Sequence, residues 1–164
     1  MAAPSRMNPA LREALAAAAP DLERHCRDPW TVIGSAAAAL AGAEVSVADL
    51  DVLTSVRDAE ALIALWHDRR DAAYLPATGA DRFRSRFARF RFPGLPLELM
   101  GGLELNGLQG WRPVQVRETV LVDCDGIAVP IPAPAEQVRI LQGFARPKDL
   151  QRAALLAAVH SPDR

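Results

Sequence analysis

Val32-Ile33-Gly34-Ser35 and, after thirteen intervening residues, Asp49-Leu50-Asp51-Val52 form the stretch of this 164-residue sequence that decides its fold. An apolar run that stops at Gly34-Ser35 indicates a strand, a tight turn and the start of a helix. Such a helix start presents free backbone N–H groups and the positive end of the helix dipole, which together suit a phosphate. We therefore expect a phosphate-binding turn at Gly34 and Ser35.

The second half of the stretch predicts a metal site. Residues two apart in a strand point to the same face, so Asp49 and Asp51 would place both carboxylates at one spot while Leu50 faces the core. Two adjacent carboxylates need a cation. Mg²⁺ fits, because it binds one or two carboxylates and keeps water and phosphate oxygens as its other ligands. The sequence thus predicts that Mg²⁺ and a phosphate bind here as one unit.

Strand and helix patterns alternate outward from this stretch. Strands are expected at 30–33, 47–54, 82–92, 95–100, 114–122 and 127–131, and helices at 36–40, after Ser55, at 135–141 and at 146–159. Asp125-Gly126 predicts a hairpin turn, so the acidic pair Asp123 and Asp125 is assigned to that turn and not to a metal. The pattern favours an α+β fold, a mixed β-sheet with flanking helices.

Both ends of the chain are expected to be helical. Residues 1–28 form the N-terminal helical segment, in which Asn8 caps a helix with Pro9 at its first position and Pro20 interrupts it. Residues 134–160 form the C-terminal helices. Because no long linker or internal repeat separates these parts, we expect one domain over residues 1–164.

Composition narrows the functional classes. Nineteen basic and twenty acidic side chains give a formal net charge of −1, which argues against a dedicated nucleic-acid binder. The two cysteines lie far apart, and the three histidines share no metal-ligand spacing, so neither a disulfide framework nor a zinc site is predicted. The apolar runs are too short to span a bilayer, and no signal segment follows Met1. A cytoplasmic protein without a membrane partner is expected.

Five arginines crowd the segment 82–91. Arg82, Arg84 and Arg86 would share one strand face, whereas Arg89 and Arg91 fall on the other, and a bulge is expected near residues 87–88. We interpret the run as an exposed or edge strand kept soluble by charge. A phosphate-binding face is the alternative.

The sequence resembles the nucleotidyltransferase superfamily, which has the DNA polymerase beta-like fold. Its signature is a hydrophobic residue, Gly-Gly or Gly-Ser, a helix and then acid-hydrophobic-acid-hydrophobic, and Ile33-Gly34-Ser35 with Asp49-Leu50-Asp51-Val52 matches it. The closing part, Val129-Pro130-Ile131-Pro132 followed by Arg146-Pro147-Lys148-Asp149-Leu150, is similar to small bacterial members related to aminoglycoside and lincosamide adenylyltransferases and to abortive-infection toxins.

This resemblance implies an Mg²⁺-dependent transfer of a nucleoside monophosphate from a nucleoside triphosphate, ATP being expected, to a hydroxyl of a small molecule or an RNA end. Asp49, Asp51 and Glu98 would be both the catalytic and the metal-binding residues, with Glu98 completing a second metal site or acting as base. Glu104 is the fallback for Glu98. Three residues would contact the nucleotide: Gly34, Ser35 and Lys148. A homodimer or a partner protein is a further expectation.

Departures from the family pattern support an alternative. Val45 and Val47 stand where the antibiotic-modifying relatives carry an arginine and a threonine, and Gln142 replaces a common lysine. The alternative is a catalytically inactive nucleotide-binding module, or an interaction module of the toxin–antitoxin type, with the same fold. A purely structural domain would bind no nucleotide at all.

Overall fold

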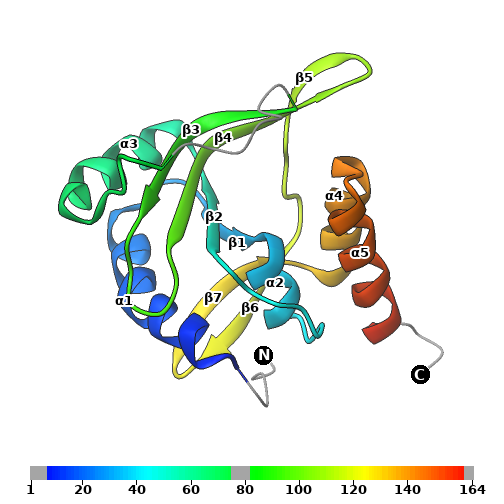
Figure 1. The fold of residues 1–164 in the computed structure, drawn as a ribbon, viewed down its shortest axis with the longest axis horizontal. Coiled ribbons are helices and arrows are strands. Elements are labelled where there is room, and N and C mark those ends of the chain that lie inside the picture. The colour runs from blue at the N-terminus through cyan, green and yellow to red at the C-terminus, as the bar shows by residue number, and fades with distance from the viewer. Residues whose placement is uncertain (1–6, 75–81, 161–164) are drawn as a thin grey trace.

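The computed structural model describes residues 7–74 and 82–160, and it centres on a five-stranded mixed sheet (Figure 1). The strand order is β1-β2-β4-β3, with β5 paired to β4 beyond this path. These strands are β1 (Thr31–Ile33), β2 (Leu50–Thr54), β3 (Phe83–Phe90), β4 (Leu97–Gly107) and β5 (Gly110–Pro113). Only β2 and β4 run parallel, whereas the other pairs are antiparallel. The α+β expectation of a mixed sheet with flanking helices is confirmed.

A separate hairpin of β6 (Thr119–Cys124) and β7 (Ile127–Pro132) packs beside β1. Asp125 and Gly126 form its turn with φ angles of 55° and 87°, the positive values that a two-residue hairpin turn requires. The Thr31 hydroxyl donates to the Pro130 carbonyl at 3.1 Å and joins the hairpin to the main sheet. The predicted turn is therefore confirmed.

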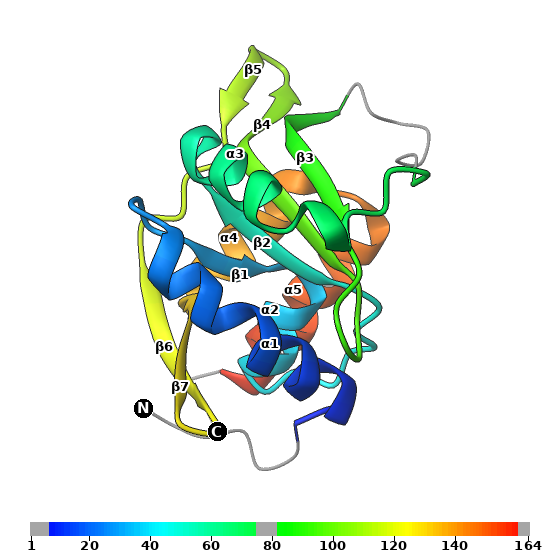
Figure 2. The ribbon, with the colours of Figure 1, turned by 90° about the vertical axis from the view of Figure 1, so that its left-hand side faces the viewer.

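Helices cover both faces of the main sheet (Figures 1 and 2). One face packs against α1 (Pro9–His25) and α3 (Val56–Leu65), and its buried cluster includes Leu50, Val52 and Leu99. On the other face, α4 (Pro134–Phe144) packs against Leu53, and α5 (Pro147–Val159) lies beside α4. The short α2 (Gly34–Leu40) follows β1 directly, and a 3-10 turn spans His67–Arg69.

Several expected elements have different bounds in the structure. Helix α1 runs through Pro20 because its buried stripe of alanine and leucine side chains, including Leu15 and Leu22, holds both halves on one core, while Pro20 itself is exposed. Residues 114–118 are not a strand, so only the second half of the expected strand 114–122 forms, as β6. The interruption of β3 lies between Arg84 and Arg86 instead of near residues 87–88.

Local signals set the helix starts. Asn8 accepts from the backbone N–H of Ala10 at 2.8 Å, and Ser55 accepts from that of Asp58 at 3.2 Å, so both expected caps are present. Among the described residues, no helix is both long enough and apolar enough to cross a membrane.

Candidate functional site

Asp49, Asp51 and Glu98 meet where the two central parallel strands, β2 and β4, begin. Asp49 immediately precedes β2, and the parallel register of β2 and β4 sets Asp51 directly beside Glu98. Each of the three carboxylates offers an oxygen, and these oxygens all lie within 4.8 Å of one another. The structure thus brings together the three acidic residues that the sequence singled out.

Glu104, the fallback for the third acid, lies elsewhere. It is opposite Arg84 in the β3–β4 pair, and its Oε1 accepts from Arg84 Nε at 2.8 Å. A residue six positions beyond Glu98 on the same extended strand is about 20 Å further along. The register of β2 with β4 therefore brings Glu98, and not Glu104, to Asp49 and Asp51.

Gly34 touches the cluster. It begins α2 with a φ of 69°, and a Cβ placed there would lie 2.6 Å from Asp51 Oδ2. The position needs glycine both for the positive φ and for the close approach of the carboxylate. Within the described residues no side chain caps the start of α2, and Ser35 is buried there.

The cluster carries an electrostatic cost. Burial raises the pKa of Asp51 to about 8, and the charges of Glu98 and Asp49 add to the rise. Burial, followed by the charge of Asp49, also raises the pKa of Glu98. Crowded, partly buried carboxylates favour any nearby cation, because a positive charge removes their mutual repulsion.

Two basic side chains of α5 supply part of that charge. Arg152 and Lys148 both oppose the rise in the pKa of Asp51, and Lys148 does the same for Glu98. They lie four residues apart, which places them on one face of the helix. The sequence had indicated Lys148, whereas Arg152 was missed although its helical spacing from Lys148 pointed to it.

Arg89 lies within the cluster. Its Nη1 donates to Asp49 Oδ1 at 3.0 Å and to Glu98 Oε1 at 3.1 Å. Its guanidinium carbon is also 4.4 Å from the centre of the Tyr74 ring. The interpretation of the arginine run as a charged, solvated strand is thus wrong for Arg89, because β3 presents it to the carboxylates across β4.

The other strand arginines have different partners. Arg84 pairs with Glu104, and Arg86 Nε pairs with Glu60 Oε1 of α3 at 2.5 Å, both at exposed positions. The Arg82 guanidinium donates to the Phe144 carbonyl. Three partly exposed, internally paired arginines do not make a phosphate-binding face on this strand.

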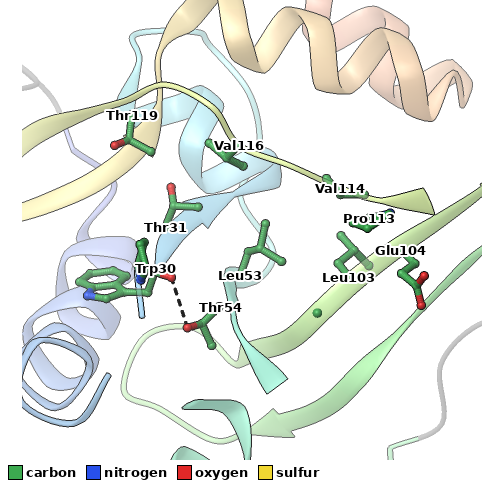
Figure 3. A pocket seen from close by; sticks show the side chains of 12 residues that line it. Trp30, Thr31, Leu53, Thr54, Leu103, Glu104, Pro113, Val114, Val116 and Thr119 are labelled. Atoms are coloured by element: carbon green, nitrogen blue, oxygen red, sulfur yellow. Dashed lines mark hydrogen bonds between the residues drawn. The ribbon is translucent and has the colours of Figure 1, made fainter. Parts of the chain in front are cut away.

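A separate pocket of about 380 Å³ has walls from β1, β2 and β4, and none of the three carboxylates of the cluster lines it (Figure 3). Its wall includes Leu53 of β2, Leu103 of β4 and Thr31 of β1, and the segment with Val114 and Val116 closes its far side. Leu53 is two residues beyond Asp51 along β2, and from there the lining extends away from the cluster to Glu104 and Pro113. Most of its lining is apolar.

The donor set suits Mg²⁺. Three carboxylate oxygens are hard ligands of the kind Mg²⁺ prefers, and among the described residues no cysteine or histidine joins the group. The second acidic pair does not compete, because Asp123 Oδ1 accepts from the Gly126 N–H at 2.8 Å within the hairpin turn. The residues present therefore fit the predicted ion.

Solved structures share this fold. A candidate nucleotidyltransferase from Thermotoga maritima superposes with a TM-score of 0.70 and 20% identity over 94% of this chain and 96% of that one. An antigenic nucleotidyltransferase-like protein from Paracoccidioides brasiliensis superposes with a TM-score of 0.55 and 14% identity over 91% and 76%. No protein-family model matches the chain, and no curated protein matches its sequence. The likeness establishes the nucleotidyltransferase fold.

Proposed function

We propose that this protein is an Mg²⁺-dependent nucleotidyltransferase that moves a nucleoside monophosphate from a nucleoside triphosphate, ATP being the expected donor, to a hydroxyl acceptor. The observation that carries the proposal is the group of Asp49, Asp51 and Glu98, whose oxygens lie within 4.8 Å of one another. It lies beside the Gly34 turn of a nucleotidyltransferase fold.

Each residue at the site has a role in this reaction. Asp49, Asp51 and Glu98 would hold Mg²⁺, which when bound polarises the phosphate and offsets its charge. The backbone N–H groups of Gly34 and Ser35 bind the phosphate tail at the start of α2. Lys148 adds positive charge from α5, opposite the carboxylates.

The chemical step is an in-line displacement. The acceptor oxygen forms a bond to the α-phosphorus while the bond from that phosphorus to the bridging oxygen breaks, and pyrophosphate leaves. The proton of the acceptor hydroxyl passes to Glu98 or to solvent water. Arg152 and Lys148, whose charges lower the pKa of Asp51, would offset the charge of the departing pyrophosphate.

The acceptor is proposed to be a small molecule or an RNA end. The pocket with Leu53 in its wall supports a small acceptor, because its volume of about 380 Å³ falls within the range of small-ligand sites and Leu53 is two residues beyond Asp51 on β2. The pocket would provide apolar surface for the acceptor, whereas the carboxylate cluster is polar.

The test is calorimetry with Mg²⁺ and each of the four nucleoside triphosphates, followed by a pyrophosphate-release assay on a panel of hydroxyl acceptors. We expect Mg²⁺-dependent binding and acceptor-dependent release of pyrophosphate. Binding without release on any acceptor would favour the inactive nucleotide-binding module. If no nucleotide binds with or without Mg²⁺, the proposal is wrong.

A further inference from the structure

We infer that Arg89 takes the place of a second divalent cation, so that the carboxylate cluster binds one metal ion and not two. The inference rests on the proposed function for the existence of a metal site, but it concerns how many ions that site accepts. Arg89 would replace the second metal ion whose site Glu98 was expected to complete.

The position of the guanidinium is the first support. One nitrogen, Nη1, contacts two of the three carboxylates, at 3.0 Å from Asp49 and 3.1 Å from Glu98. A cation that bridges two carboxylates in this way sits where a second metal ion would find its ligands. Asp51 has no hydrogen bond or ion pair in the described structure and stays available for the remaining ion.

The second support is that the surroundings hold Arg89 in place. Arg89 pairs with Glu98 across β3 and β4, and its side chain keeps only 20% of its surface exposed. The Tyr74 ring stacks over the guanidinium, and the Asp71 N–H donates to the Arg89 carbonyl at 2.8 Å. A side chain fixed from the strand, the ring and the carboxylates is a component of the site and not a mobile surface group.

Charge and ligand count agree with a single ion. Three carboxylates and the Arg89 guanidinium leave two net negative charges, and Lys148 and Arg152 of α5 add further positive charge nearby, so little negative charge remains to attract a second divalent cation. Every carboxylate has two oxygens, so Asp49 and Glu98 can each give one to Arg89 and keep one for the metal. A second divalent ion would have to displace Arg89 or bind beside its positive charge, which would repel the ion.

Mn²⁺ binding with inorganic tripolyphosphate, the part that all nucleoside triphosphates share, tests the inference without any turnover. Stoichiometry comes from calorimetry, and electron paramagnetic resonance detects coupling between two ions about 3.5–4 Å apart. We expect the wild-type protein to bind one Mn²⁺ with an uncoupled spectrum. Arg89→Gln is expected to bind two with a coupled spectrum, and Arg89→Lys, which keeps the charge, to bind one.

Arg91→Gln is the matched control. Arg91 is an exposed arginine of the same segment whose nearest carboxylate is Asp71, at 3.4 Å, so this variant should bind one ion. Circular dichroism confirms that each variant is folded. Two coupled ions in the wild-type protein, or one ion in folded Arg89→Gln, would overturn the inference and leave the proposed function standing. If the wild-type protein binds no Mn²⁺, the metal site of the proposed function fails as well.

Discussion

The Asp51 carboxylate destabilises the metal-free folded chain, although the proposed function uses it as a metal ligand. Its carboxylate is half-buried beside two others, and this burial raises its pKa to about 8. A buried charge without a partner is unfavourable, and the proposed Mg²⁺ would supply that partner. The same reasoning applies to Gly34, where a conformation that most residues avoid brings the backbone against that carboxylate.

The Asp51→Asn variant separates the electrostatic cost of the Asp51 carboxylate from its proposed role as a metal ligand. The pKa of Asp51 is raised from 3.8 to about 8, so the folded state keeps a proton that the unfolded chain loses, and stability falls as the pH rises through this window. Without metal, Asp51→Asn should therefore melt at the same temperature as wild type or higher at pH 8, with a smaller difference at pH 5.

The same variant should lose the ligand effect. Mg²⁺ with a nucleoside triphosphate stabilises the wild-type fold by binding to it preferentially, and thermal melts should show no such shift for Asp51→Asn. Asp123→Asn, in the hairpin turn, is the control and should keep the full shift. A marked loss of stability in metal-free Asp51→Asn, or an undiminished shift, would contradict the assignment.

At the scale of elements, the site is built from β1, α2 and β2 together with the neighbouring strands β4 and β3. The motif in β1, α2 and β2 could be read from local sequence, because spacing and residue type determine it. The neighbours of β2 could not. Only the parallel pairing with β4 selects Glu98 over Glu104, and only the pairing of β3 with β4 brings Arg89 to the cluster.

The turn between β1 and α2 offers a matched pair of glycine variants. Gly34 and Gly126 have φ angles of 69° and 87°, so an alanine at either is strained by about 1 kcal/mol. A Cβ at Gly126 meets nothing within 4 Å, whereas one at Gly34 meets Asp51 Oδ2 at 2.6 Å. Both variants should lose stability in denaturant melts, and Gly34→Ala should lose more because its Cβ also meets the Asp51 carboxylate.

Only Gly34→Ala should also lose binding of Mg²⁺ and nucleotide, because it displaces the Asp51 carboxylate and the N–H groups beside it. Calorimetry on both variants distinguishes the effects. Equal affinity of Gly34→Ala and Gly126→Ala for the nucleotide would show that the turn does not form part of the site.

For the whole molecule, the fold class and the positions of most helices followed from hydrophobic periodicity and capping residues. Tertiary packing overruled local signals at Pro20, where the core holds α1 together, and at residues 114–118, which cross from β5 to β6 without pairing as a strand. The net charge of −1 likewise hides how the charges are arranged. The three acidic residues of the cluster lie where β2 and β4 begin, and Lys148 and Arg152 of α5 lie near them, an arrangement of charges that suits the proposed Mg²⁺–nucleotide complex.

The central claim is that the carboxylate cluster beside Gly34 binds a divalent cation together with a nucleoside triphosphate. Its most direct test is an anomalous difference map from a crystal soaked with Mn²⁺ and α,β-methylene-ATP. The account predicts a peak about 2.0–2.2 Å from oxygens of Asp49 and Asp51, with the phosphate tail at the start of α2. Density for the nucleotide elsewhere on the molecule, or a peak at the hairpin acids Asp123 and Asp125 with none at the cluster, would contradict it.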